Sequence, residues 1–300
     1  MTSYELMSQL KIEETNTHQI IDKQQLSPQA KMIRIHAPEI ADKAKAGQFV
    51  ILRVDEEGER IPLTLADWEN QTGTITLIFQ EVGLSTKKLG CLQVRDGIVN
   101  LAGPLGRAST IKNYGRAAIV CGGVGTAAAY PIAKALKEAG NTVVSILGAR
   151  NDSLLILEEE MSQVSDELYI ATDDGSKGHK GFVSDVLRCL IFKHYQFDIV
   201  YAIGPPLMMR ATSEVTRPFG IKTMASLNPI MVDGMGMCGA CRVSIGSTTK
   251  FACIDGPEFD AHKTDFEELI RRLRIYPQEE RLALDFHEKA SGGICKCRQH

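Results

Sequence analysis

The sequence has little net charge, few cysteines and no long apolar run. Its formal net charge is −3 over 300 residues, which gives no reason to expect a nucleic-acid partner. No segment approaches the roughly 20 apolar residues of a membrane span, and the N-terminus lacks the basic and apolar regions of a signal peptide. Eight unevenly spaced cysteines are too few for a disulfide scaffold. We therefore predict a cytoplasmic protein that binds neither membrane nor nucleic acid.

Changes in residue pattern divide the chain into five segments. Residues 1–17 are polar and unpatterned, and we interpret them as a tail. Over 18–110, short alternating apolar runs separated by Pro, Gly and Asp predict a β-barrel or sandwich. Over 111–225, apolar strands alternate with helices, which is typical of a doubly wound parallel sheet with ligands at the carboxyl ends of its strands. A small cysteine-bearing module follows over 226–262, and helices with a tail complete 263–300.

The most specific motif lies in the cysteine-bearing module. It reads Asp233-x4-Cys238-x2-Cys241, with Cys253 twelve positions further on. The plant-type [2Fe–2S] loop is written C-x4-C-x2-C…C, so an aspartate stands here in the position of the first thiolate. The spacing predicts a [2Fe–2S] cluster with these four residues as ligands. A structural zinc site with a Cys3Asp tetrahedron is the alternative.

Two pieces of the β region indicate a phosphate-bearing ligand. Arg60-Ile-Pro62-Leu63-Thr64 is a strand broken by proline, and Gly83-Leu-Ser85-Thr86 begins a short helix. A helix N-terminus presents unpaired amides and a positive dipole end, which suit a phosphate. The alternatives are a simple N-cap for Ser85 and Thr86 and a solvated strand residue for Arg60.

Three loops at one edge of the predicted parallel sheet indicate a nucleotide site. Gly122-Gly123-Val-Gly125-Thr126 is a weak dinucleotide signal alone, because tight turns between strand and helix use glycine anyway. Two further loops at the same sheet edge, 172–176 and 204–209, strengthen this dinucleotide signal. Arg150, after the second strand, could add a guanidinium near a ribose or its phosphate, and its alternative is a solvated strand end.

These motifs, in this order, resemble those of the ferredoxin-reductase-like electron-transfer subunits, a group that includes the dihydroorotate dehydrogenase electron-transfer subunit. The R-x-P-L-T strand, the CGGVG and GPP-x-MM loops and the Asp-bearing cluster loop carry the resemblance over residues 18–274. Within the group, Asp233 is similar to the pattern of NADH-dependent reduced ferredoxin:NADP+ oxidoreductase small subunits and of sulfide dehydrogenase subunits. The orotate branch has cysteine there.

The resemblance implies a ferredoxin-reductase-like FAD barrel, a doubly wound nucleotide domain and a C-terminal [2Fe–2S] module. FAD would bind Arg60, Pro62, Leu63 and Thr64 along its isoalloxazine and ribityl chain, and Gly83, Ser85 and Thr86 at its pyrophosphate. NAD(H), the substrate, would lie over Gly123, Gly125 and Thr126, with Asp174, Gly175, Ser176, Gly204, Pro205 and Met208 around it. Arg150 is added to these cofactor-binding residues from its place after the second strand. The residues alone leave NAD against NADP open, because Arg150 could contact a 2′-phosphate that Asp173 and Asp174 would repel.

The implied function is electron transfer between NAD(H), FAD and the [2Fe–2S] cluster, to or from a larger flavin and [4Fe–4S] subunit. The expected assembly is an electron-bifurcating ferredoxin:NADP oxidoreductase, which would reach ferredoxin through the complex. No side chain is expected to act as a catalytic acid or base, because the flavin exchanges both hydride and single electrons. The alternatives are an electron-transfer subunit of a sulfide- or dihydroorotate-linked oxidoreductase and a zinc-stabilised nucleotide sensor.

Overall fold

The computed structural model describes residues 18–291, and the proposed tail over 1–17 and the last nine residues lie outside this range. Antiparallel strands build the first unit, in the order β1-β2-β5-β4-β3-β6. An isolated bridge between Gln19 and Gly97 joins β1 to the segment before β6, so the sheet curls into a barrel. The strands are β1 (Ile20–Gln25), β2 (Ala30–His36), β3 (Phe49–Arg53), β4 (Arg60–Glu69), β5 (Thr74–Gln80) and β6 (Asn100–Leu105).

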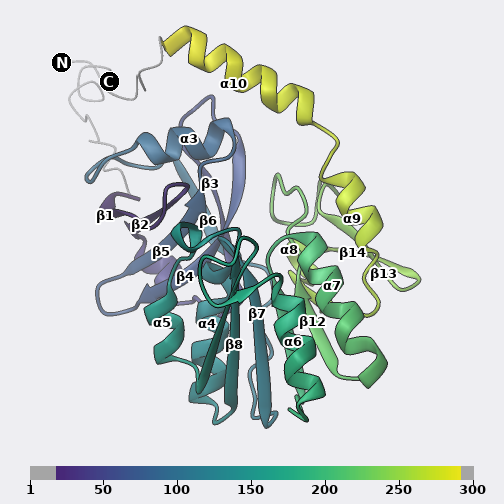
Figure 1. Cartoon of the computed structure of the whole chain (residues 1–300). Coiled ribbons are helices and arrows are strands. Elements are labelled where there is room, and N and C mark those ends of the chain that lie inside the picture. The colour runs from purple at the N-terminus through teal and green to yellow at the C-terminus, as the bar shows by residue number, and fades with distance from the viewer. Residues whose placement is uncertain (1–17, 292–300) are drawn as a thin grey trace, which may run out of the picture.

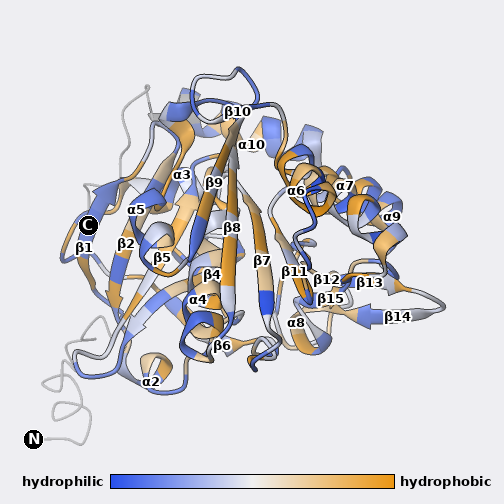
Figure 2. Ribbon diagram, turned by 60° about the horizontal axis from the view of Figure 1, so that its bottom comes forward, coloured by the Kyte–Doolittle hydropathy of each residue, from blue (hydrophilic) through white to orange (hydrophobic). Residues whose placement is uncertain are grey.

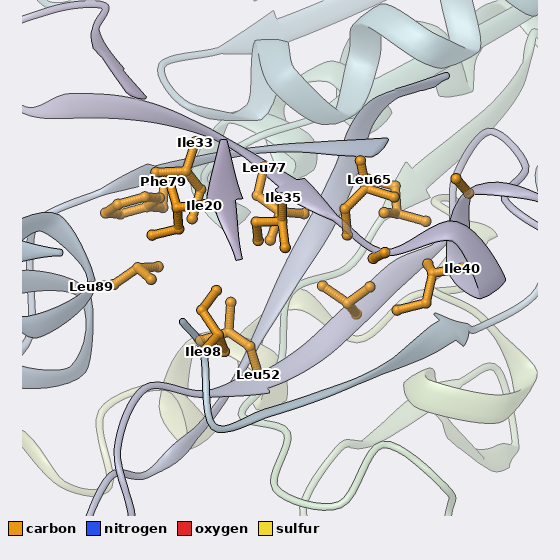
Figure 3. Packing of buried hydrophobic residues seen from close by; sticks show 14 of the residues in the cluster. Ile20, Ile33, Ile35, Ile40, Leu52, Leu65, Leu77, Phe79, Leu89 and Ile98 are labelled. Atoms are coloured by element: carbon orange, nitrogen blue, oxygen red, sulfur yellow. The ribbon is translucent and has the colours of Figure 1, made fainter. Parts of the chain in front are cut away.

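Branched aliphatic side chains fill the barrel. Ile33, Leu52, Leu65 and Leu77 have no exposed surface and converge from different strands (Figure 3). Their positions follow from the alternation of apolar and polar residues along each strand, which turns one face inward. Two helices accompany the barrel, α2 (Pro38–Ala41) and α3 (Leu84–Cys91). The predicted barrel is therefore confirmed.

The second unit is a sheet of order β10-β9-β8-β7-β11-β12-β15, parallel except at β15. Its central strands are almost continuously apolar, as expected of strands covered on both faces (Figure 2). The strands are β7 (Arg116–Gly122), β8 (Thr142–Ala149), β9 (Glu167–Thr172), β10 (His179–Lys180), β11 (Ile199–Ile203), β12 (Lys222–Ser226) and β15 (Glu258–Asp260).

Helices cover both faces of this sheet, which confirms the doubly wound architecture. Ile119 of β7 packs with Ile132 of α4 (Gly125–Glu138), and α5 (Glu158–Gln163) lies on the same side. Val120, the next residue of β7, packs with Leu187 of α6 (Val183–Phe192) on the opposite face. The helix α7 (Pro206–Thr216) also lies there, while α4 is sandwiched between the sheet and β4 of the barrel. Short 3-10 turns lie at η1 (Asp152–Leu154) and η2 (Arg217–Phe219).

The cysteine-bearing module sits between β12 and β15. It contains an antiparallel hairpin, β13 (Arg242–Ile245) and β14 (Thr248–Phe251), followed by α8 (Ala252–Asp255). After β15 come α9 (Phe266–Arg272) and α10 (Pro277–Ser291), and α10 returns across the molecule to α3 (Figure 1). Among residues 18–291, no helix combines the length and apolar character that crossing a membrane requires.

Candidate functional site

A cavity of about 600 Å³ lies where the barrel, the parallel sheet and the start of the cysteine-bearing module meet. Its sheet side is formed by the loops after β7 and β11, neighbouring strands whose connections run to opposite sides. Such a switch point is the usual ligand site of a doubly wound sheet. The predicted residues that line this cavity are Pro62, Leu63, Thr64, Thr86, Gly123, Gly125, Gly204 and Pro205.

The two glycine loops fit together so closely that side chains are excluded. A Cβ atom on Gly125 would lie 2.5 Å from the carbonyl oxygen of Ile203, so only glycine lets α4 begin against the end of β11. Gly123 has a φ of +56° and open space above it. The loop therefore combines a tight turn with free room on its cavity side, which is what a dinucleotide phosphate needs above a helix N-terminus.

Two other predicted nucleotide residues support this loop from below. The hydroxyl of Thr126 is buried and donates a hydrogen bond of 2.9 Å to the carbonyl oxygen of Gly123. The half-buried Met208 lies under both loops, with its sulfur 2.8 Å from the place of a Cβ atom on Gly122. In this structure both side chains hold the loops and lie outside the cavity lining.

The N-terminus of α3 faces the cavity through Thr86. Its hydroxyl accepts hydrogen bonds of 3.1 Å from the amides of Val82 and Gly83 and donates one of 3.0 Å to the Gly83 carbonyl. The hydroxyl of Ser85 is buried and donates to Glu59. The Thr86 hydroxyl therefore has the capping role, whereas the Ser85 hydroxyl ties the helix start to Glu59. The first-turn amides of a helix have no intrahelical acceptor. Arg60 is exposed at the start of β4 and lies outside the lining.

The loop after β9 lies outside the cavity as well. Asp174, Gly175 and Ser176 form an exposed turn, in which Asp174 accepts from the amide of Ser176. Arg150 is also exposed, and its guanidinium donates to the side-chain oxygen of Gln29 at 2.9 Å. Gln29 in turn accepts from Gln80, which lines the cavity, so Arg150 joins the sheet to the barrel at the cavity rim.

Sequence reasoning missed several lining residues. Phe49 faces the cavity beside Thr64, its partner in the β3–β4 ladder, and looked like an ordinary core aromatic. Ser226, the last residue of β12, lines the cavity together with Asn228 and Met231, which follow it. A signal existed for these three, because they lie at the carboxyl end of a parallel strand. The mixed polarity of Lys222–Ser226 concealed that strand.

The four predicted cluster ligands lie in two pairs. The Sγ atom of Cys238 is 3.2 Å from Oδ1 of Asp233, and the Sγ atoms of Cys241 and Cys253 are 3.1 Å apart. Each iron of a [2Fe–2S] cluster takes two protein ligands, so two pairs fit it. A zinc site needs its ligands around one ion, and no group of three or more His, Cys, Asp or Glu among the described residues could hold a single ion.

The two pairs have different surroundings. Cys241 and Cys253 are buried, and burial together with the Cys241 contact raises the pKa of the Cys253 thiol to about 12. Cys238 is exposed and Asp233 half-buried. Partial burial opposes ionisation of Asp233, but the Cys238 thiol and three loop amides bond to its carboxylate and keep its pKa below the ordinary value. In the exposed pair, the Asp233 carboxylate is therefore an anion that the loop amides already stabilise.

The cluster loop is seated directly on the barrel. Gly234 has a φ of +74°, and a Cβ atom there would lie 2.7 Å from Cγ1 of Ile51 and 2.8 Å from Cδ1 of Leu105. The loop exposes Met235 and Met237 on its outer side. Because Met231 lines the cavity and Asp233 is two residues further along, the loop runs from the cavity to the ligand pairs without a break.

A half-buried carboxyl group connects β15 to the segment between the barrel and the sheet. Glu258 of β15 is the register partner of Ser226 and accepts a hydrogen bond of 2.5 Å from the Ser109 hydroxyl. Burial raises the pKa of Glu258 to about 7, and the bond from Ser109 opposes this shift only in part. The segment between the barrel and the sheet is thereby tied to the end of the cysteine-bearing module.

Comparison with known proteins agrees with both sites. Residues 119–214 match the oxidoreductase NAD-binding domain, and residues 228–265 match the iron–sulfur cluster binding domain of dihydroorotate dehydrogenase B. The chain is similar to a Thermotoga maritima homologue of the dihydroorotate dehydrogenase B (NAD+) electron transfer subunit. The two are 45% identical over 278 residues, which cover 93% of this chain and 98% of the relative.

Solved structures show the same relationship. The structure of NADH-dependent reduced ferredoxin-NADP oxidoreductase, described for its flavin-based electron bifurcation, aligns with a TM-score of 0.86 at 44% identity, covering 90% of this chain and 97% of its own. A Neisseria gonorrhoeae ferredoxin NADP+ reductase aligns with a TM-score of 0.55 at 17% identity, over 68% of this chain and 90% of its own, which shows the ferredoxin-reductase-like fold. The chain therefore belongs to the dihydroorotate dehydrogenase B electron-transfer subunit family and is an oxidoreductase subunit with an NAD-binding and an iron–sulfur cluster-binding domain.

Proposed function

We propose that this chain is the electron-input subunit of an NADH-dependent, flavin-based bifurcating oxidoreductase that acts in the cytoplasm. FAD and the nicotinamide would share the cavity, and Asp233, Cys238, Cys241 and Cys253 would hold a [2Fe–2S] cluster. One observation supports this most directly: the segment that closes the cavity at Asn228 and Met231 continues straight into the cluster loop. A bound flavin exchanges hydride with nicotinamide and single electrons with an iron–sulfur centre.

The side chains at the cavity suit this role because they bind and shield and need not react. Pro62 and Leu63 offer apolar contacts for a flat ring, and Thr64 offers a hydroxyl beside Phe49. The beginnings of α3 and α4 both reach the cavity, through Thr86 and Gly125, so two helix N-termini are available to phosphates.

NAD rather than NADP is the proposed substrate. Arg150, the cation that the sequence analysis considered for a ribose phosphate, is bonded to Gln29 of the barrel. The neighbouring turns carry Asp152, Asp173 and Asp174, which would repel a 2′-phosphate. The NADH-dependent name of the similar solved structure agrees with this choice.

The proposed partner is a larger subunit that carries a flavin and [4Fe–4S] clusters and reaches ferredoxin. A subunit of a dihydroorotate-linked oxidoreductase is the second candidate, supported by the name of the family. Asp233 favours the first, because the resemblance noted above places cysteine at this position in the orotate branch. Purifying the native complex and identifying the partner by mass spectrometry separates the two.

The experiment that tests the proposal is an anaerobic visible spectrum before and after NADH, with iron and zinc assayed in the same sample. We expect flavin bands over a broad iron–sulfur absorption, bleaching on NADH, and about two irons per chain. A colourless protein with one zinc per chain would contradict the proposal and leave the zinc-stabilised nucleotide sensor.

A further inference from the structure

An arginine from outside the cluster loop donates a hydrogen bond to the turn between two of the expected ligands. The guanidinium Nη2 of Arg272, on α9, donates a hydrogen bond of 3.0 Å to the carbonyl oxygen of Ala240. Ala240 lies between Cys238 and Cys241, so this contact fixes the backbone of the C-x-x-C turn. Its sequence separation from Arg272 is 32 residues, so the contact depends on the folded position of α9.

One donor of the same guanidinium lacks an acceptor in the part of the chain that the structure describes. Within residues 18–291, the buried Nε atom of Arg272 has no hydrogen-bond partner, and Arg272 forms no ion pair with a carboxylate. A buried donor is unfavourable unless an acceptor lies nearby. The anionic groups expected at this turn are the cluster and its ligands.

We propose that Arg272 is a positioning residue for the [2Fe–2S] cluster and that its charge raises the reduction potential of the cluster. The inference rests on the proposed function, because it requires the cluster on Cys238 and Cys241. Cluster reduction adds negative charge, which a nearby fixed cation stabilises, and net charge and hydrogen bonding are among the factors that set such potentials. The hydrogen bond to the Ala240 carbonyl also holds Cys238 and Cys241 in position for assembly of the cluster.

The test compares Arg272→Gln with Arg271→Gln in the whole flavin-loaded chain. Arg271 is the adjacent residue of α9, has the same charge and is exposed, so its variant controls for long-range charge. The readouts are iron per chain, the rate of iron loss to a chelator, and the cluster midpoint potential by electron paramagnetic resonance. We expect Arg272→Gln to lose iron faster and to lower the equilibrium constant for reduction at least tenfold, and Arg271→Gln to change neither by more than twofold.

Equal shifts in the two variants, or wild-type values for Arg272→Gln, would overturn the inference. If Arg272→Gln does not fold, as judged by flavin content and circular dichroism, Arg272→Lys decides. It keeps the charge but replaces the planar fork by a single ammonium, so we expect faster iron loss with a potential near wild type. Wild-type chelator resistance in Arg272→Lys would then contradict the proposed role. Failure of the proposed function would look different, because the wild-type chain itself would contain no iron.

Discussion

A Cβ atom on Gly125 would lie 2.5 Å from the carbonyl oxygen of Ile203. The first residue of α4 and the last residue of β11 therefore touch through backbone atoms alone. This contact brings the two glycine-bearing loops of the sheet to one side of the same cavity.

We expect Gly125→Ala to destabilise the fold by about 2 kcal/mol, because the methyl group would force α4 away from β11 in a packed interior. Gly123→Ala is the matched control, since a Cβ atom there meets open space and costs only about 1 kcal/mol for its left-handed backbone. Urea unfolding of both variants checks the order, and titration with NADH should show weaker binding for Gly123→Ala as well. Equal stability of the two variants would show that the loop relaxes around Gly125.

Thr86→Val should loosen the start of α3 without unfolding the barrel. It removes a hydroxyl that bonds the backbone of Val82 and Gly83, a capping loss of about 1 kcal/mol. We expect lower flavin occupancy after purification and a faster loss of flavin on dilution. Thr248→Val is the control, because its hydroxyl also bonds a backbone carbonyl, that of Ile245, in a hairpin outside the cavity lining. If both variants retain flavin as the wild type does, α3 does not contact the cofactor.

Asp233→Cys should keep about two irons per chain and change the cluster potential, because a thiolate replaces a harder oxygen ligand at the same position. Asp233→Ala removes both the ligand and the acceptor for three loop amides, so we expect it to lose most of its iron while the flavin remains. Iron assays and electron paramagnetic resonance distinguish the two. A folded Asp233→Cys chain without iron would refute simple ligand exchange, and an Asp233→Ala chain with full iron would show that Asp233 only organises the loop.

Glu258→Gln should remove a pH dependence of stability. The pKa of Glu258 is raised to about 7, above the ordinary glutamate value, so protonated Glu258 stabilises the folded chain at low pH. This contribution is complete below about pH 4.5 and is lost as the pH rises through about 7. Glutamine can still accept from Ser109, so relative to wild type the variant should gain up to about 3 kcal/mol in unfolding free energy between pH 4.5 and pH 8.

Urea unfolding across this pH range measures that difference. Ser109→Ala provides the opposite control, because it removes a donor that favours the ionised carboxylate and should steepen the wild-type dependence. A difference between Glu258→Gln and wild type that is independent of pH would contradict the shifted carboxyl group.

The sequence predicted the strands that are almost wholly apolar and missed those that are short or of mixed polarity. Ile199–Ile203 is wholly apolar and was recognisable, whereas Lys222–Ser226 mixes polar and apolar residues and Glu258–Asp260 is too short to show a period. The apolar run from Leu154 to Leu157 shows no boundary before the helix that follows, yet α5 begins only at Glu158, because Leu157 adopts a left-handed φ of +56°. Tertiary contacts, which local patterns do not contain, decide these cases.

For the candidate sites, residue spacing predicted only those groups whose members lie close together along the chain. The ligands from Asp233 to Cys241 lie in one loop, and their approach followed from the motif. Arg272 and Phe49 come from distant segments, and no local pattern marks them. The loop after β9 carries convincing residues, Asp174 to Ser176, but β9 lies two strands away from β7, so the turn lies outside the cavity lining.

The pairing of β15 with β12 has a consequence for how the protein is made. Because the sheet receives its last strand only after residues 228–257 have been synthesised, the cluster loop leaves the ribosome before the sheet can close. A chain shortened after Ser226 would keep every parallel strand, yet β12 would present a bare edge ready to pair with another molecule. The cysteine-bearing module is thus built into the sheet as an insertion, so a replacement module must join the chain at Ser226 and Glu258 to keep β12 and β15 paired.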